Sequence, residues 1–269
     1  MSAAPANQEL VRVQKHGKVA VFTLCDPPAN TYSHAMMRQL DAAILDARMD
    51  AGVEVIVLTG AGERFFCAGA NIAMLETADP TWKYWFCLHA NETLLRLEHT
   101  PKLVVAALNG HTVGGGLEVA LACDLRIARA AAGKIGLPEV KLGVLPGTGG
   151  TQRLLRLVGK SKAIELMATA RNLDVAEAQA LGLVNESIGC PPGEFLAKVI
   201  ERCAEFTTPR AAALAIGHMK RAVQSGAEMA LEQGLALERE LQAKLFASDD
   251  AREGLAAFTA KRDARFEGR

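Results

Sequence analysis

The chain has 269 residues, half of them apolar, and its 30 basic and 30 acidic residues give a formal net charge of zero. This length and composition suit one large domain, or one domain with an appendage, built around an ample core. Because no basic block stands out, broad nucleic-acid affinity is disfavoured, and the apolar runs are strand-sized and far too short to span a membrane.

The first half of the chain alternates strand-like and helix-like segments. The N-terminal alternation of apolar residues, broken at His16-Gly17-Lys18, predicts a β-hairpin. A one-sided apolar pattern with Ser33 as N-cap predicts a helix over about 33–50. The pattern then predicts strands at 53–59, 103–108 and 125–128, helices at 82–97 and 118–123, and a turn-rich connection over 60–69. This order favours parallel strands covered by helices, an α/β fold.

After about Thr151 the pattern becomes almost entirely helical. Apart from a brief strand-like run near 183–184, helical periodicity is found at 162–169, 175–180, 192–206, 210–225 and 227–246. In the last of these segments Leu237, Leu241 and Leu245 share one face, with Leu231 nearby. Such a face either forms a subunit interface or folds back on its own domain, and the pattern alone favours neither.

Several kinds of site are disfavoured by the sequence. The six cysteines lack CxxC spacing and are expected to be reduced, buried thiols, with a catalytic role for Cys67 or Cys123 as a minor alternative. The six histidines show no metal-ligand spacing, so no metal site and no cofactor are expected. Residues 1–18 lack the apolar segment of a signal peptide and the Arg/Ser-rich pattern of a transit peptide, which predicts a soluble cytoplasmic protein.

Two glutamates in glycine-rich surroundings are the most informative residues. Glu118 follows Gly114-Gly115-Gly116, whose backbone amides are bare, and it opens a helix, where unpaired N–H groups and the helix dipole favour negative charge. Glu139 follows a proline in GLPEVKLG. Two carboxyl groups beside an activated carbonyl suit acid–base chemistry, and two like charges close together require that at least one pKa be raised.

Three segments resemble the signature motifs of the crotonase, or enoyl-CoA hydratase/isomerase, superfamily, in the family's order. They are FFCAGANI at 65–72, NGHTVGGGLEVALACDLRIA at 109–128, and the segment from IGLPEVKLG to AIELM at 135–167. DPPAN at 26–30 and the ending at 253–269 are also similar, so the resemblance covers nearly the whole chain. It implies a crotonase-like spiral of ββα repeats over 1–195 as the catalytic domain, followed by a helical trimerisation region over 196–269 that assembles trimers or dimers of trimers.

The resemblance also implies a site and a reaction. An acyl-CoA thioester would be held by the backbone N–H groups of Ala70 and Gly115, and Glu118 and Glu139 would activate water and deliver a proton. The reaction would be syn hydration of a trans-2-enoyl-CoA to a 3-hydroxyacyl-CoA, a lyase reaction of fatty acid metabolism. By motif position the substrate and CoA contacts fall on Ala29, Ala68, Ala70, Asn71, Ile72, Gly114, Gly115, Pro138, Gly147 and Lys261.

The chain departs from the family pattern at two places. Asn71 stands where many relatives carry Asp, which leaves the hydrogen bonding of that loop open. The first loop, 28–31, has no lysine. Lys261, from this chain or a neighbouring subunit, is then either a contact for a CoA phosphate or a free surface lysine, and the sequence favours neither. PGTGGTQR at 146–153 is interpreted as a loop lining the acyl pocket, and Trp82 and Trp85 as packing residues near the acyl tunnel.

Other functions remain open from the sequence. Within the superfamily they are a double-bond isomerase, a decarboxylase, or a hydratase for a branched or cyclic acyl-CoA, because a fold does not fix a reaction. Outside it, an RNA-binding or purely structural role is possible in principle, but neutral charge and the absence of a basic tract argue against nucleic acid as a partner.

Overall fold

The structure is a computed structural model that describes residues 8–269. Residues 1–7, which contributed to the prediction of localisation, lie outside the described part. Across residues 8–269, no helix is both long enough and apolar enough to cross a membrane.

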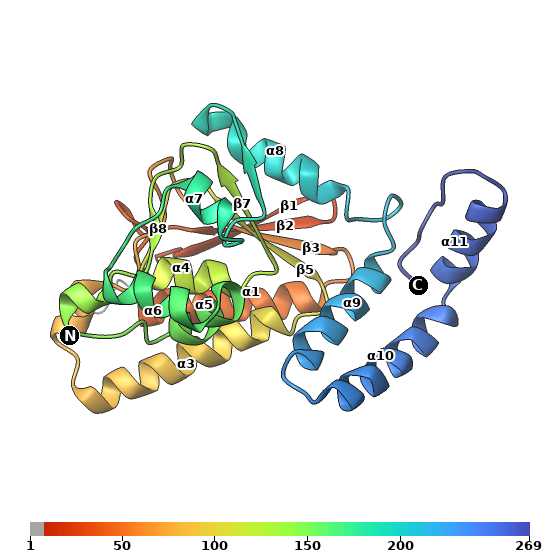
Figure 1. Ribbon diagram of the computed structural model, residues 1–269. Helices are drawn as coiled ribbons and strands as arrows, with labels where there is room; N and C mark the ends of the chain where they lie inside the picture. The colour runs from red at the N-terminus through yellow and green to blue at the C-terminus, as the bar shows by residue number, and fades with distance from the viewer. Residues whose placement is uncertain (1–7) are drawn as a thin grey trace.

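A six-stranded sheet in the order β1-β2-β3-β5-β7-β9 forms the centre of the molecule (Figure 1). The predicted hairpin is confirmed: β1 (Val11–His16) and β2 (Val19–Leu24) pair antiparallel around Gly17, whose φ is +61°. The other neighbours pair parallel, as predicted; these strands are β3 (Val55–Gly60), β5 (Leu103–Leu108), β7 (Leu125–Arg129) and β9 (Glu186–Ile188). The brief strand predicted near 183–184 is found slightly later, where it begins at Glu186, and the two apolar residues that suggested it belong to the buried core.

A second, small sheet was not predicted by the sequence pattern. Its three parallel strands are β4 (Phe65–Cys67), β6 (His111–Val113) and β8 (Ile135–Gly136). Strands of two or three residues are too short to show a periodicity, so β4 was hidden in the connection predicted over 60–69. Each small strand directly follows a long one, β3 before β4, β5 before β6 and β7 before β8. The chain therefore winds as a spiral of ββα units, as the resemblance implied.

Helices cover both faces of the large sheet (Figure 1). Residues at alternate positions of β2, β3, β5 and β7 pack on one face against α1 (His34–Met49), α3 (Pro80–Glu98) and α4 (Gly115–Leu121). The intervening residues pack on the other face against Phe195, Val199 and Cys203 of α8 (Pro192–Ala204). Ser33 caps α1 as predicted, since its side chain accepts from the backbone N–H of Met36.

Five short helical segments fill the loops around the small sheet. One of them, α5, corrects the prediction of a loop over 146–153, because the helix begins inside that segment at Gly150. The five segments are α2 (Ile72–Glu76), the 3₁₀ turn η1 (Glu139–Leu142), α5 (Gly150–Val158), α6 (Lys160–Ala168) and α7 (Val175–Ala180).

The C-terminal helices α9 (Ala213–Gly226), α10 (Leu231–Phe246) and α11 (Asp249–Thr259) extend to one side of the sheet (Figure 1). Helix α9 is tied to the core by Lys220, which is buried and pairs with Asp124 at 2.8 Å. The division placed at residue 195 falls inside α8, whose side chains belong to the sheet core. We propose that the core extends through α8 and that the helical region begins after it.

Candidate active site

The carboxyl ends of the three small strands bring the sequence-predicted site residues together. Ala70 lies in the loop that follows β4, Gly115 follows the end of β6 after one intervening residue, and Glu139 lies just after β8. Because the three strands are parallel, these ends meet at one edge of the sheet, the edge at which ligands bind in many α/β proteins. Helix α4 also begins there, with the positive end of its dipole toward the edge.

Two backbone amides at this edge are free to bind a ligand. Gly69 has a φ of +97°, and a Cβ built on it would lie 3.1 Å from the amide nitrogen of Gly115, so the two loops touch. The bonds from Tyr32 N to Gly69 O (2.9 Å) and from Asn71 N to Tyr32 O (3.0 Å) fix the backbone on either side of Ala70. Residues 8–269 offer no hydrogen-bond acceptor to the amides of Ala70 and Gly115. Such a pair of donors suits a developing oxyanion.

Glu118 is almost completely enclosed, with 2% of its surface exposed. The backbone N–H groups of Thr148 and Gly150 both donate to its Oε1 at 2.7 Å. Burial raises the pKa of Glu118, and these hydrogen bonds oppose that rise because they favour the charged form. A Cβ on Gly150 would lie 3.0 Å from the same oxygen and 2.8 Å from Cβ of Pro146, so a side chain here would have to displace its neighbours.

Glu139 lies in a different environment a short distance away. It is half-buried on η1, and its Oε2 has no hydrogen-bond partner within residues 8–269. Burial, with a smaller contribution from the charge of Glu118, raises the pKa of Glu139 to about 7. A Cβ on Gly114, whose φ is +56°, would lie 3.0 Å from its Oε1. The prediction of a raised pKa is confirmed, although desolvation rather than like charge is the main cause.

The helix that carries Glu118 begins earlier than predicted, at Gly115 rather than at residue 118. The glycines hide the start of the helix in the sequence, since glycine is a poor helix former. A Cβ on Gly116 would lie 2.0 Å from the carbonyl oxygen of Cys67, so close packing against β4 requires this glycine. As a result the Gly115 amide is a first-turn N–H, which has no partner inside the helix.

The residues predicted to contact substrate on the β4 side lie next to the free amides. The Ala68 N–H donates to the carbonyl oxygen of Ala29 at 3.0 Å, which joins the first loop to the β4 loop. The Asn71 side chain accepts from the backbone N–H of Met74 at 3.0 Å and caps α2, so the neutral side chain serves here as a helix cap. Ile72, the first residue of α2, is 48% exposed beside it.

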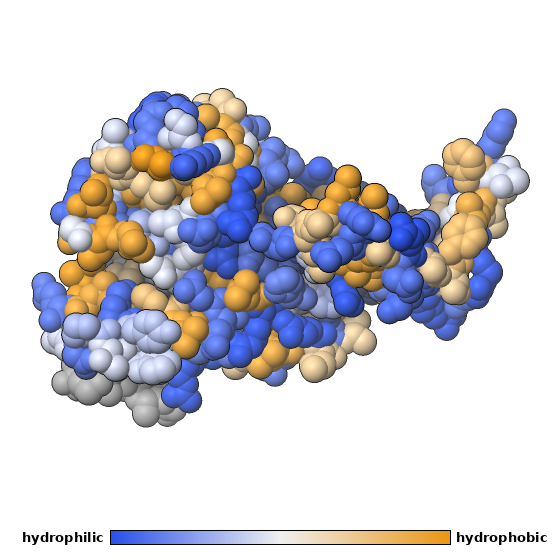
Figure 2. Space-filling view, turned by 60° about the horizontal axis from the view of Figure 1, so that its bottom comes forward, coloured by the Kyte–Doolittle hydropathy of each residue, from blue (hydrophilic) through white to orange (hydrophobic). Residues whose placement is uncertain are grey.

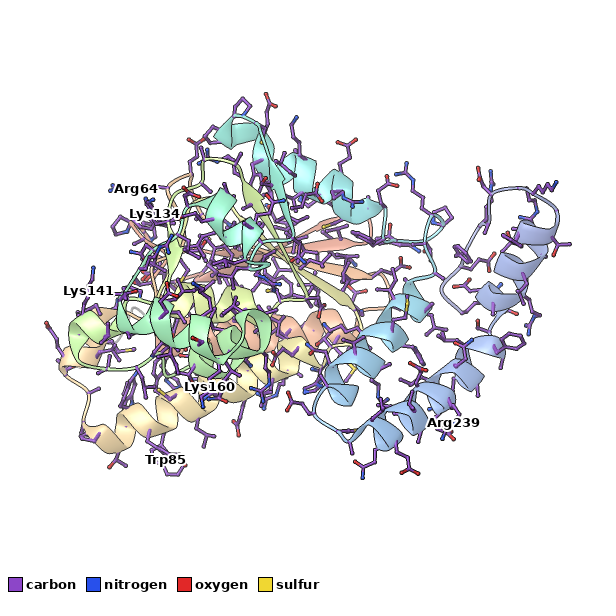
Figure 3. All side chains as sticks on the ribbon, in the orientation of Figure 1. Arg64, Trp85, Lys134, Lys141, Lys160 and Arg239 are labelled. Atoms are coloured by element: carbon purple, nitrogen blue, oxygen red, sulfur yellow. The ribbon has the colours of Figure 1, made fainter. Side chains whose placement is uncertain are left out.

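On the other side of the site, two further predicted contacts flank the glutamates. Pro138 immediately precedes Glu139, and its carbonyl oxygen accepts from Lys141 N at 3.0 Å within η1. Gly147 immediately precedes Thr148, which binds Glu118. The side chain of Lys141 points outward from the edge of the molecule (Figure 3).

Two predicted features lie away from these residues. Lys261 follows α11, in the C-terminal part of the chain that lies at the far end of the molecule from α4 (Figure 1). Within one chain it does not join the site. Trp82 stacks on Phe86 with ring centroids 5.3 Å apart, whereas Trp85 is 58% exposed and points away from the body (Figure 3). Packing is thus confirmed for Trp82 but not for Trp85.

The two cysteines considered as nucleophiles are poorly suited to that role. Burial raises the pKa of Cys67 and of Cys123 to about 12, which keeps both thiols protonated at neutral pH. They pack in the main core. Cys25 and Cys203 are also buried, as the sequence predicted, whereas Cys87 and Cys190 are only partly buried.

Sequence reasoning missed two residues that contact this site, Tyr32 and Thr148. Both are buried, and their hydroxyl oxygens lie 2.7 Å apart. A single tyrosine in a loop and a single threonine between glycines carry no periodic signal. Arg153 supports the same loop: it donates to the carbonyl oxygen of Thr148 at 3.1 Å and forms a bidentate pair with Glu98.

Comparison with known proteins gives a consistent result. Residues 14–269 match the family model described as enoyl-CoA hydratase/isomerase. The chain is 41% identical to a protein named probable enoyl-CoA hydratase from Rhizobium meliloti, over 97% of this chain and 99% of that one. It is 38% identical to a short-chain-enoyl-CoA hydratase from Clostridium acetobutylicum, covering 94% and 95% of the two chains. A crystal structure of an enoyl-CoA hydratase from Geobacillus kaustophilus superposes with a TM-score of 0.93 at 42% identity, covering 98% of each chain.

Proposed function

Because this chain belongs to the enoyl-CoA hydratase/isomerase family, with a crotonase-like fold, we propose that it is an enoyl-CoA hydratase, a hydro-lyase. It would add water reversibly, in the syn sense, to a trans-2-enoyl-CoA and give a 3-hydroxyacyl-CoA. The observation that carries the proposal is the arrangement at the start of α4: two free amides adjoin two carboxyl groups whose surroundings differ.

In the proposed reaction the thioester oxygen accepts hydrogen bonds from the N–H groups of Ala70 and Gly115. Negative charge grows on that oxygen as water attacks C3, and fixed backbone donors stabilise it without reorganising. Removing one such donor lowers kcat by about 10²- to 10³-fold in enzymes of this type. A Cβ at Gly114, Gly115 or Gly116 would meet Glu139, Tyr32 or Cys67, respectively, so the three glycines let these parts of the site pack closely around the amides.

The two glutamates divide the proton transfers in this proposal. Glu118, whose charged form two backbone N–H groups favour, orients the water and accepts its proton. The oxygen of water bonds to C3, the electrons of the double bond move to C2 through the enolate, and C2 takes a proton from Glu139. A carboxyl with a pKa of about 7 holds a proton for part of the time at neutral pH and so suits this donor role. The pair is reset when a proton returns from Glu118 to Glu139.

The assay that tests this function follows the loss of conjugated enoyl absorbance with crotonyl-CoA and with longer trans-2-enoyl-CoA substrates. Turnover with formation of the 3-hydroxyacyl-CoA is expected. The same residues permit a second reaction of the family, double-bond isomerisation by proton transfer through Glu139. If the protein converts a 3-enoyl-CoA but hydrates no 2-enoyl-CoA, the proposal of a hydratase is wrong and the isomerase takes its place. If it hydrates only branched or cyclic substrates, it is a hydratase specific for those acyl groups.

We also propose that the chain self-associates, as a trimer or a dimer of trimers, through its C-terminal helices. Leu241 of α10 turns inward, whereas Leu231, Leu255 and Phe258 are 78%, 56% and 85% exposed. Hydrophobic side chains gather on this projecting end (Figure 2), and such an exposed apolar surface is typical of a subunit interface. In the assembly Lys261 of a neighbouring subunit would reach the CoA phosphates. A mass of 28.6 kDa, that of one chain, measured by light scattering at micromolar concentration would contradict the assembly.

A further inference from the structure

Tyr32 contacts both halves of the candidate site at once. Its backbone carbonyl and amide bind Asn71 N and Gly69 O, one on each side of Ala70. Its side chain extends to the opposite half, where its hydroxyl oxygen lies 2.7 Å from Oγ1 of Thr148. The ring is 3% exposed and stacks on Phe86 of α3, with centroids 6.0 Å apart, so the hydroxyl is held in place.

Thr148 continues this connection to the carboxyl group of Glu118. Its backbone N–H donates to Oε1 of Glu118 at 2.7 Å. Its hydroxyl also faces this carboxyl and favours the charged form. A carboxylate only accepts hydrogen bonds, and the Thr148 hydroxyl has a single proton. When that proton points toward Glu118, the Tyr32 hydroxyl is the donor to Thr148. Burial and the charge of Glu118 raise the pKa of Tyr32 well above its usual value, so its proton stays available for this bond. When Tyr32 donates to the Thr148 hydroxyl, it polarises that hydroxyl and strengthens the interaction of Thr148 with Glu118.

The glycine at 115 fits the same arrangement. A Cβ on Gly115 would lie 2.3 Å from the Tyr32 hydroxyl oxygen, so the hydroxyl fills the space that a side chain at 115 would occupy. The hydroxyl therefore adjoins the residue whose amide is a proposed oxyanion donor. Tyr32 thus binds the residues on either side of Ala70 and packs against Gly115, while its direct partner Thr148 binds the Glu118 carboxyl.

We infer that Tyr32 is a positioning residue of this site, whose backbone fixes the Ala70 amide and whose hydroxyl, through Thr148, fixes the Glu118 carboxylate. This inference rests on the proposed hydratase function for its catalytic readout. Tyr32 itself touches neither the water nor the thioester in this arrangement.

The first test is Tyr32→Phe, which keeps the stacked ring and removes only the hydroxyl. We expect kcat for hydration to fall about tenfold, the loss that one buried hydrogen bond typically causes, with KM changed less than about twofold. Because the lost bond favoured the charged carboxylate, the acidic limb of the kcat profile should move to higher pH. Tyr84→Phe removes the same atom from the exposed tyrosine of α3 and should change neither quantity.

The second test uses variants of Thr148. Thr148→Val should slow hydration at least as much as Tyr32→Phe, and Thr148→Ser should restore a rate within about twofold of wild type. The double variant Tyr32→Phe/Thr148→Val should be no slower than Thr148→Val alone, because the two hydroxyls act as one unit. Wild-type kcat and an unmoved acidic limb in Tyr32→Phe, or losses that multiply in the double variant, would overturn the inference.

The pH dependence of thermal stability needs no catalysis, so it tests the role of Tyr32 separately from the proposed hydratase function. The stability lost in Tyr32→Phe should grow as pH rises and Glu118 ionises, and this growth should vanish in a Glu118→Gln background. If wild type hydrates no enoyl-CoA but this pH-dependent coupling is present in thermal melts, the proposed function fails and the link from Tyr32 to Glu118 stands. If hydration is found and the coupling is absent, the positioning role fails.

Discussion

The regions around Glu118 and Glu139 hold the same kind of side chain under opposite conditions. Glu118 lies in the first turn of a helix, nearly inaccessible, with one oxygen held by two backbone amides. Glu139 lies on a short 3₁₀ turn, half-buried, with one oxygen left without a hydrogen bond in the described structure. The difference teaches that the surroundings of a carboxyl group, and not its residue type, decide how far backbone hydrogen bonds offset the effect of burial on its pKa.

The largest effect is expected at the better-held carboxyl. Glu118→Gln keeps an oxygen to accept from Thr148 N and Gly150 N but removes the group that takes the proton of water. We expect kcat to fall by about 10³- to 10⁴-fold with little change in KM, at the upper end of what a positioned acid or base contributes. Steady-state kinetics with crotonyl-CoA measure this, and near-wild-type turnover would remove Glu118 from the mechanism.

Glu139→Gln should cause the next largest loss, about 10²- to 10³-fold in kcat, because it removes the proton that C2 receives. The pH profile of wild type tests the same group more sharply. With a pKa of about 7 in the free enzyme, kcat/KM for hydration should fall as pH rises through 7. For dehydration of the 3-hydroxyacyl-CoA, kcat/KM should fall over the same range. Hydration consumes no net proton, so the equilibrium constant that relates the two directions does not depend on pH. A kcat/KM for hydration that rises or stays level as pH passes through 7 would contradict the assignment of Glu139 as the acid.

One glycine lies against each carboxyl group, so a single added methyl group can disturb the position of Glu118 or of Glu139 separately. A Cβ at Gly114 would lie 3.0 Å from Glu139 Oε1. A Cβ at Gly150 would lie 3.0 Å from Glu118 Oε1 and 2.8 Å from Cβ of Pro146. We expect Gly150→Ala and Gly114→Ala each to lower kcat about tenfold or more, because a small displacement of a catalytic group slows the reaction strongly.

Each of these variants has a matched control. Gly193 lies near the start of α8 with open space around it, as Gly150 lies at the start of α5, so Gly193→Ala tests the change of residue alone. Gly62 shares the positive φ of Gly114 but has open space, so Gly62→Ala tests backbone strain without the contact. If the controls lose activity as the site variants do, the contact with the carboxyls is not the cause.

The sequence was sufficient for one part of this site and insufficient for another. Glu118, Glu139 and the glycine run lie in contiguous motifs, so their types and spacing were visible, and the long strands and helices had clear periods. The edge that joins the motifs is built from strands of two or three residues, which leave no pattern. The Tyr32–Thr148 bond joins residues 116 positions apart, and nothing local in either segment encodes such a pairing.

The smallest effect concerns stability, and it separates the two regions without any substrate. The pKa of Glu139 is about 7 in the folded chain and about 4.3 when unfolded, so between these values the folded state binds more protons. Wild-type stability should therefore fall, relative to Glu139→Gln, as pH rises from about 4.5 to about 7, and stay level above.

In melting temperature, Glu139→Gln should match wild type near pH 4 and exceed it by about 2 °C at pH 8, because the half-buried charge is partly screened. Glu165→Gln is the matched control, because the pKa of Glu165 is lowered in the folded chain whereas that of Glu139 is raised. The exposed Glu165 pairs with Lys162, which holds its pKa below the usual value, so its removal should lower the melting temperature slightly at pH 8. A Glu139→Gln variant that melts below wild type at pH 8 would show that the carboxylate is well solvated, and the contrast with Glu118 would then have to be explained by geometry alone.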